Sequence, residues 1–255
     1  MHCLRSSKVT SLPGARSVAP ERLDNLAADD PLAMDSRRDL QRLHRAMRSL
    51  TILKDALSRI NGATPPKRIL ELGAGDGSLL LRLARAMRPQ WGDLELTLLD
   101  RQNLLSASAR RAFDERNWHV TVLCMDALEW ARSAPAQHYD LCITTLFLHH
   151  FESADLGYLL AGVATRADAF IACEPRRNRI THLGSRLIGL LGANEVTRED
   201  GVKSVAAGFN HLELTELWSK VPGDWRSDEY SAWPFTHCFW AARANVDSAA
   251  NHRER

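Results

Sequence analysis

Short apolar runs alternate with helical patterns of apolar residues through the middle of the chain. In each helical pattern the apolar residues recur three or four positions apart, and each run has the length of a buried strand. The runs cover residues 69–72, 94–99, 119–124, 139–145 and 169–173, and the helical patterns cover 79–84, 103–116, 127–132 and 154–166. Because parallel strands need a crossover between them, this alternation predicts an α/β fold with a doubly wound, mostly parallel sheet.

The pattern changes after residue 175. Two amphipathic helices are expected over 179–191 and 213–221, in a stretch rich in glycine and alanine. Two strands, 225–233 and 235–241, then meet at a turn at Trp233-Pro234. Two strands joined this closely are antiparallel. We therefore expect a seven-stranded sheet with an antiparallel last strand, and a cap insertion over about residues 176–222 before the last two strands.

The two ends of the chain differ from this core. Residues 1–20 and 245–255 are polar and are predicted to be disordered tails. Between residues 21 and 64 one helical stripe of apolar residues builds up, with Asp35 and Ser36 as candidate N-caps. The stripe consists of Leu40, Leu43, Met47, Leu50, Leu53, Leu57 and Ile60. This segment is expected to be an N-terminal helical lid over a main domain of residues 65–244.

Glycines follow the first apolar run at alternate positions. Gly73, Gly75 and Gly77 separate the predicted strand from the helix that begins near Ser78, and Glu71 precedes the first glycine by two. Glycine allows positive φ angles and a close approach of ligand to backbone. The free N–H groups at a helix N-terminus suit a carboxylate or a phosphate. The stretch therefore predicts a ligand-binding turn.

This turn resembles the first motif of class I S-adenosylmethionine-dependent methyltransferases. The third glycine comes one residue too early for a dinucleotide fingerprint, and the pattern E-x-G-x-G-x-G is similar to the methyltransferase one. The resemblance implies a seven-stranded sheet and S-adenosylmethionine as cofactor, with the glycine turn, Ala74 included, receiving its methionine portion. It covers about residues 67–175, and the last strand pair more loosely.

Acidic residues follow the second and third strands, where ligands of open α/β sheets bind. Asp100 is placed to accept hydrogen bonds from both ribose hydroxyls, a role that fits NAD equally, and Arg101 is a candidate to flank the adenine. Asp126 by itself predicts a helix N-cap. The resemblance implies that Asp126 binds the adenine amino group and that the Ala127 backbone N–H meets a ring nitrogen.

The segment after the fourth strand is expected to lie near the methyl group. The resemblance adds Thr145 and Leu146 to the cofactor-binding residues. His149 and His150 are the histidines predicted at the strand ends, and imidazole titrates in the range useful for a base. We predict that one of them removes the acceptor's proton, with His150 preferred, although a packing or capping role explains either residue.

The acceptor side of the predicted site contains aromatic and basic residues. Phe147, Arg176 and Arg177 are candidate substrate-binding residues, the arginines for an acidic or phenolate group or as partners of Glu174. Core packing and a solvated helix turn explain the same residues. No metal is expected, because Asp140 lies at the beginning of the fourth strand, on the wrong edge of the sheet.

Composition narrows the class of protein. The formal net charge is +2, so no strong field favours nucleic acid. No apolar run approaches the length of a membrane span, and the five cysteines include no C-x-x-C pair. These features favour a cytoplasmic protein without nucleic-acid or membrane partners. The oligomeric state stays open, a homodimer included.

The leading hypothesis is a methyltransferase acting on a small, aromatic or polyketide-derived acceptor, at oxygen because a histidine base suits a hydroxyl. An NAD(P)-dependent oxidoreductase is the first alternative, disfavoured by Ser78 and by the terminal strand pair. A nucleic-acid methyltransferase and a catalytically silent cofactor-binding partner subunit are further alternatives.

Overall fold

A seven-stranded sheet forms the centre of the molecule. The computed structural model describes residues 15–60, 65–87, 90–187, 189 and 192–244. The strands are β1 (Arg68–Leu72), β2 (Leu94–Asp100), β3 (Trp118–Cys124), β4 (Leu141–Thr145), β5 (Ala169–Pro175), β6 (Trp225–Ala232) and β7 (Thr236–Arg243). Their order is β3-β2-β1-β4-β5-β7-β6, and β7 alone runs opposite to the other strands, antiparallel to both β5 and β6. The predicted fold class and the antiparallel end are confirmed.

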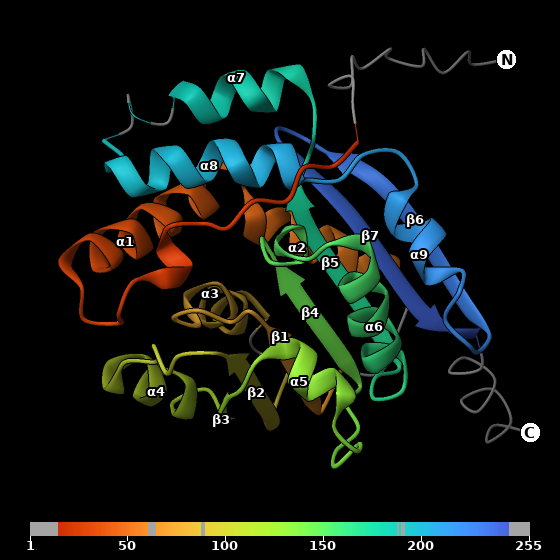
Figure 1. The fold of residues 1–255 in the computed structure, drawn as a ribbon. Coiled ribbons are helices and arrows are strands. Elements are labelled where there is room, and N and C mark those ends of the chain that lie inside the picture. The colour runs from red at the N-terminus through yellow and green to blue at the C-terminus, as the bar shows by residue number, and fades with distance from the viewer. Residues whose placement is uncertain (1–14, 61–64, 88–89, 188, 190–191, 245–255) are drawn as a thin grey trace, which may run out of the picture.

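Helices cover both faces of this sheet (Figure 1). One face packs against α2 (Ser49–Arg59), α3 (Ser78–Met87) and α4 (Ala107–Asp114), and the other against α5 (Ala127–Arg132), α6 (Ser153–Ala164) and α9 (Glu213–Trp218). Neighbouring residues of β1 point to opposite faces, so Ile69 belongs to one apolar core and Leu70 and Leu72 to the other. Burial on both faces explains why the strands are continuous apolar runs.

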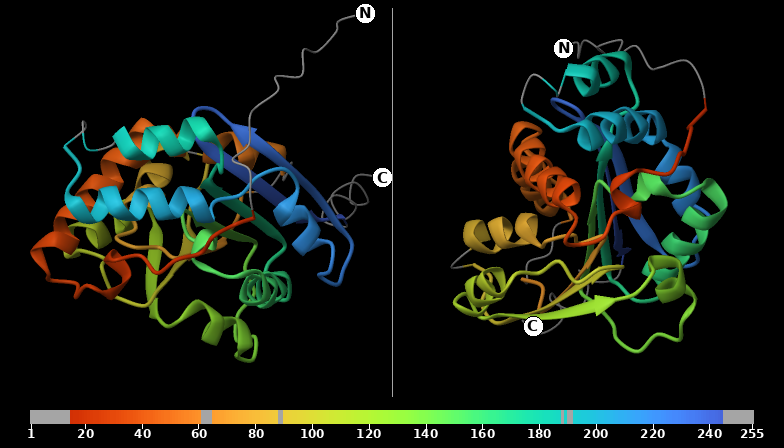
Figure 2. Two further views of the ribbon diagram at one scale, coloured as in Figure 1. Left: turned by 45° about the horizontal axis from the view of Figure 1, so that its top comes forward. Right: turned by 60° about the vertical axis from the view of Figure 1, so that its left-hand side comes forward.

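A third group of elements lies beyond the carboxyl ends of β4 and β5. It comprises η1 (Leu23–Asn25), α1 (Pro31–Ala46), η2 (Leu148–His150), α7 (Arg179–Leu187) and α8 (Glu195–Ala207). Figures 1 and 2 show α1, α7 and α8 gathered on this side of the molecule, with residues 15–30 running alongside α8. The acceptor side of a ligand site is therefore built from segments at both ends of the chain.

The N-terminal region departs from the single helical lid expected over residues 21–64. Helix α1 begins at Pro31, where the Asp30 carboxylate accepts a hydrogen bond from the Leu32 N–H, so Asp35 and Ser36 lie inside the helix. Arg48, with a φ of 57°, then separates α1 from α2. Helix α2 packs into the core of the domain. Only the part up to α1 covers the strand ends, and residues 61–64 lie outside the described residues.

Two other boundaries differ from expectation. Residues 15–20 of the expected tail make contacts: Arg16 donates hydrogen bonds to the carbonyls of Ala207 and Phe151. The rest of that tail, and the tail expected over 245–255, lie outside the described residues. Within the expected cap, α9 packs on the sheet, where Trp218 stacks on Phe170 with ring centroids 5.4 Å apart. The cap itself is therefore α7 and α8. Among the described residues, no helix combines the length and apolarity needed to cross a membrane.

Candidate active site

The glycine turn after β1 has the backbone geometry that the motif predicts. Gly73, Gly75 and Gly77 have φ angles of +66°, +54° and +69°, a region that other residues adopt at a cost. A Cβ atom on Gly73 would lie 2.3 Å from the Phe147 ring, whereas one on Gly75 would meet nothing within 4 Å. The Ala74 N–H donates to the Leu99 carbonyl at 3.1 Å. The turn is thus fixed against β2 and has open space over Gly75.

Two carboxyl groups flank this turn. Asp100 accepts the Gly75 N–H at 2.9 Å through Oδ2 and the Gln102 N–H at 3.0 Å through Oδ1. Glu71 is buried, and its Oε2 has no hydrogen-bond partner among the described residues. Burial, and then the charges of Asp76 and Asp100, raise the pKa of Glu71 well above its usual value. A buried acid beside open backbone fits the ammonium group of the predicted cofactor, which would supply the missing partner.

The predicted adenine-binding residues follow β2 and β3 at the same edge of the sheet as the glycine turn. Asp126 caps α5, accepting the backbone N–H groups of Leu128 and Glu129 at 2.8 and 3.2 Å, and Ala127 is buried as the first residue of that helix. Arg101 is largely exposed, and its guanidinium lies 3.5 Å from Asp24 of the N-terminal segment. The cofactor roles of these residues stay predictions.

The end of β4 connects the turn with the acceptor side. Leu146 adopts a φ of 54°, and its N–H donates to the Cys173 carbonyl at 3.0 Å. The buried Thr145 Oγ1 has no partner among the described residues. Phe147 lies over Gly73, with its ring centroid 6.1 Å from that of His150. These predicted residues therefore stand between the glycine turn and the paired histidines.

Glu174, at the end of β5, holds the histidine segment in place. Its side chain is fully buried and accepts the backbone N–H groups of Phe147 and Leu148 at 3.0 and 2.9 Å. Its Oε2 also lies 2.8 Å from Nδ1 of His149. From the sequence, Glu174 is expected only as a partner for arginine. That pairing is wrong, because the carboxylate is occupied by η2.

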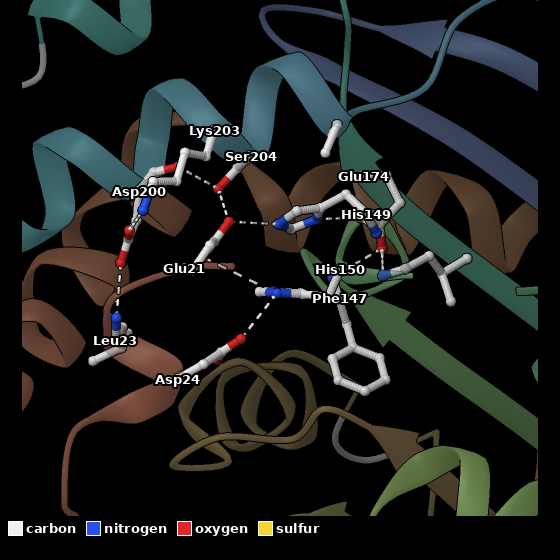
Figure 3. A network of polar contacts seen from close by, with 12 residues as sticks. Glu21, Leu23, Asp24, Phe147, His149, His150, Glu174, Asp200, Lys203 and Ser204 are labelled. Carbon is white, nitrogen blue, oxygen red and sulfur yellow. Dashed lines mark hydrogen bonds and ion pairs between the residues drawn. The ribbon is translucent and has the colours of Figure 1, made fainter. Parts of the chain in front are cut away.

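Glu21 reaches both histidines from the N-terminal segment (Figure 3). His149 Nε2 lies 3.3 Å from Glu21 Oε1, and His150 Nε2 lies 3.9 Å from Glu21 Oε2. On its other side, His150 Nδ1 lies 3.1 Å from Asp24 Oδ2. Burial alone would lower the pKa of His149, but the hydrogen bonds and charges of Glu174 and Glu21 outweigh it and raise this pKa to about 9. The predicted bases are brought together, and each faces two carboxylates.

Helix α8 fixes the segment that carries Glu21. Asp200 accepts the backbone N–H groups of Arg22 and Leu23 at 2.8 and 2.9 Å. Lys203 donates to the Pro20 carbonyl at 2.9 Å, and the Ser204 hydroxyl donates to Glu21. The backbone of residues 20–23 is therefore bound to one face of α8, and this places Glu21 opposite η2.

A cavity of about 410 Å³ opens beside this cluster. Its lining is mainly apolar and comes from α1, α7, α8 and the ends of β4 and β5, with Glu21, His149 and Ser204 at its wall. The other lining residues are Leu23, Ser36, Leu40, Leu43, Ala46, Met47, Leu146, Pro175, Thr181, Gly184, Ser185, Leu187, Val196, Thr197, Asp200, Gly201, Val205 and Phe235. A small, largely apolar molecule fits such a space.

The two arginines predicted to bind substrate lie elsewhere. Arg177 is buried and binds both Glu213 carboxylate oxygens, at 2.6 and 3.1 Å, as well as the Gly208 carbonyl at 2.5 Å. Arg176 is half-buried, and its backbone N–H donates to the Phe235 carbonyl at 2.8 Å. The described residues that line the cavity include neither arginine. The structure therefore contradicts a substrate contact for Arg177, whose guanidinium already ties the chain after β5 to α9.

Several residues of the site had no local signal in the sequence. Glu21 and Asp24 lie in a polar stretch near the predicted tail, and Asp200 and Ser204 belong to a helix with no clear apolar stripe. Only Glu174 stood at an expected position, directly after the predicted strand 169–173 and at the end of β5 in the structure. The number of residues between Glu21 and His149 is too large for any spacing rule, so only the folded chain brings them together.

Comparison with known proteins supports the family. Residues 69–167 match the family model described as a methyltransferase domain. A stretch of 91 residues, 34% of this chain, is 35% identical to part of a probable nonribosomal peptide synthetase, CymA, of Salinispora arenicola. The matched stretch amounts to 1% of that synthetase. The chain therefore corresponds to a very small part of the curated relative.

Solved structures share the fold over most of the chain. The plantazolicin methyltransferase BpumL in complex with SAH superposes with a TM-score of 0.60 over 84% of this chain and 91% of that one, at 15% identity. An O-methyltransferase family protein from Burkholderia thailandensis gives a TM-score of 0.55 over 85% and 61%, at 18% identity. At such identities the likeness is one of fold, and it agrees with the sheet order found here.

Proposed function

We propose that this chain, a class I S-adenosylmethionine-dependent methyltransferase, methylates a hydroxyl group of a small, largely apolar acceptor that is aromatic or polyketide-derived. The observation that carries the proposal is the apolar cavity, with Glu21 and His149, two members of a hydrogen-bonded cluster of carboxylates and imidazoles, at its wall. An acceptor whose apolar body fills the cavity would present a hydroxyl group to that cluster.

The cofactor's part is to supply a methyl group on a sulfonium centre. The residues that would hold it are Glu71, the glycine turn, Asp100 and Asp126. Glu71 has a buried oxygen without a partner among the described residues, the turn has open space over Gly75, and the two aspartates are held by backbone N–H groups. Leu146 belongs both to the predicted cofactor site and to the cavity lining, so the two sites meet at the end of β4. Binding both molecules in line supplies much of the rate of a displacement reaction.

The geometry favours His150 over His149 as the group that takes the acceptor's proton. Both nitrogens of His149 are hydrogen-bonded to carboxylates, which leaves no free lone pair for a hydroxyl. His150 Nδ1 is held by Asp24, while Nε2 is 3.9 Å from Glu21, beyond hydrogen-bond distance. A base fixed on one side by a carboxylate and open on the other can accept a proton.

The test has two parts. Calorimetry with S-adenosylmethionine, SAH and NAD should show binding of the first two alone. The enzyme is then incubated with methyl-labelled S-adenosylmethionine and phenols that carry alkyl tails of increasing length, and the product is identified by mass spectrometry and NMR. Label in an O-methyl ether supports the proposal. Binding of NAD alone, or label on carbon or nitrogen, would overturn it.

A matched pair of variants tests the cavity. Leu43→Trp fills space at the cavity wall and should raise KM for long-tailed phenols while leaving SAH affinity unchanged. Leu217→Trp, on α9 against the far side of the sheet, is the control. An equal effect of both variants would mean that the cavity does not bind the acceptor. A cytoplasmic location and the absence of nucleic-acid partners stay predictions from the sequence.

A further inference from the structure

Three side chains beside the cavity, two of them in its lining, converge on one point. Glu21, His149 and His150 each offer one ligand atom, and these atoms all lie within 4.8 Å of one another. His149 Nε2 and Glu21 Oε1 are 3.3 Å apart. Ligands about 2.0–2.1 Å from a tetrahedral Zn²⁺ ion lie about 3.4 Å apart. We propose that Glu21, His149 and His150 bind a divalent transition-metal ion, with Zn²⁺ as the reference ion.

The outer nitrogens of both imidazoles support this assignment. His149 Nδ1 lies 2.8 Å from Glu174, and His150 Nδ1 lies 3.1 Å from Asp24. A histidine that binds a metal almost always donates its other N–H to a carboxylate, a carbonyl or water, which fixes the tautomer and turns the free lone pair toward the ion. Here two neighbouring histidines each have a carboxylate at Nδ1, and a metal ion would replace the proton that His149 Nε2 shares with Glu21. Both inner nitrogens face the same carboxylate, Glu21.

The charges of the cluster also suit a cation. Three carboxylates, those of Glu21, Asp24 and Glu174, surround two imidazoles in a largely buried space, with exposed side-chain fractions of 11%, 37% and 0%. One divalent ion between the inner nitrogens and Glu21 would satisfy all three ligand atoms at once. Two extra protons on the imidazoles would satisfy the same contacts, and direct measurement of metal binding distinguishes the ion from the protons.

The place of the cluster gives the ion a role, which rests on the proposed methyl transfer. Two of the three ligands, Glu21 and His149, line the acceptor cavity, so a fourth coordination position would face the acceptor. A metal-bound hydroxyl group loses its proton more readily, because the ion stabilises the oxygen anion. In the metal-loaded enzyme His150 would be a ligand. The ion would then activate the acceptor hydroxyl, in place of His150 acting as a base. The sequence-based prediction of no metal depended on the position of Asp140 near β4. It did not include Glu21 as a possible ligand.

The experiment measures binding without acceptor or cofactor. The tag-free, chelator-treated chain is titrated with ZnCl₂ against a chromophoric competitor, and with CoCl₂ to record the visible absorption of tetrahedral cobalt. One equivalent of Zn²⁺ is expected to bind, with Mg²⁺ unable to compete, since imidazole ligands suit zinc and not magnesium. Glu21→Gln and His150→Ala should each weaken binding at least 100-fold, and Asp24→Asn, a positioning change, about 10- to 100-fold.

His119→Ala is the matched control. His119 forms an exposed pair with Asp93, 2.8 Å apart, next to the opposite ends of the strands, and its loss should leave Zn²⁺ affinity unchanged. Thermal melts and SAH binding establish that each variant is folded. Absence of one-equivalent Zn²⁺ and Co²⁺ binding to the wild type, or an equal loss in His119→Ala, overturns the metal site. Metal binding without any methyl transfer would instead overturn the proposed function.

Discussion

The cofactor side and the acceptor side of the site are assembled differently. On the cofactor side, the residues lie at or near the carboxyl ends of β1, β2 and β3, and the turn of residues 73–77 is a single short stretch held largely by backbone geometry. On the acceptor side, Glu21 and His149 are 128 positions apart and Glu21 and Ser204 are 183 apart. Contacts on that side are made by side chains from both ends of the chain.

The difference suggests how each side responds to change. A site made by backbone conformation is sensitive to added side-chain atoms and to φ. A site made by distant side chains is sensitive to loss of single charges and to detachment of the segment that carries them. Helix α1 serves both sides, because Gln41 binds Asp76 of the turn at 2.5 Å while Leu40 and Leu43 line the cavity.

The largest effect is expected at Gly73. Gly73→Ala should weaken S-adenosylmethionine binding by about 100-fold or more, because the new Cβ atom meets both a positive φ and the Phe147 ring at 2.3 Å. Gly75→Ala should weaken S-adenosylmethionine binding less, because Gly75 has a positive φ but open space around the new Cβ atom. Gly157→Ala in α6 is the control, with neither constraint. Calorimetry gives the affinities, and an equal loss at Gly73 and Gly75 would show that Phe147 does not matter.

Substitutions on the acceptor side should lower kcat and leave cofactor affinity nearly unchanged. Ser204→Ala removes the hydroxyl that donates to Glu21, and we expect kcat to fall about 10-fold because Glu21 loses a charge-assisted hydrogen bond. Asp200→Asn, which loosens the attachment of Arg22 and Leu23, should lower kcat further. SAH affinity should change less than twofold in both. A parallel loss of SAH affinity would mean that the two sides are not separable.

Arg177 is expected to matter for stability and for neither ligand. Arg177→Met should lower the free energy of unfolding by about 2 kcal/mol, less than for a fully buried pair, because Glu213 is partly exposed. Urea denaturation measures the loss. KM for the acceptor should stay within twofold of the wild type. A large rise in KM without a loss of stability would restore the substrate role predicted from the sequence.

The smallest expected effect is a loss of folding stability at acid pH, caused by His44 in α1. Burial lowers the pKa of His44 from 6.5 to about 4, so between these values the unfolded chain binds the proton more readily. The stability contributed by neutral His44 is complete above about pH 6.5 and is lost as the pH falls toward 4. His44 is partly exposed, so the loss is on the order of 1–2 kcal/mol.

His44→Gln should flatten this part of the pH profile. Urea midpoints measured between pH 7 and pH 4 should fall less steeply in the variant than in the wild type. His119→Gln, an exposed histidine away from α1, serves as control and should leave the slope unchanged. A wild-type midpoint that does not fall across this range would show that α1 is not sensitive to acid through His44.

The sequence by itself determined the sheet, the glycine turn and the acids that follow the strands. These features depend on local rules: apolar periodicity, the φ freedom of glycine, and the convergence of parallel strand ends at one edge. Gly73, Gly75, Asp100 and Asp126 could therefore be placed from the sequence alone, and in the structure they lie at the carboxyl ends of β1, β2 and β3.

Only the tertiary structure decided how the acceptor side is made. Glu21 lies in the site because α8 binds the backbone next to it. Arg177 lies outside the site because its guanidinium binds Glu213. His149 and His150 were visible in the sequence, but the carboxylates that surround them were not. Long-range side-chain contacts depend on where loops return in space, and periodicity and spacing carry no information on that.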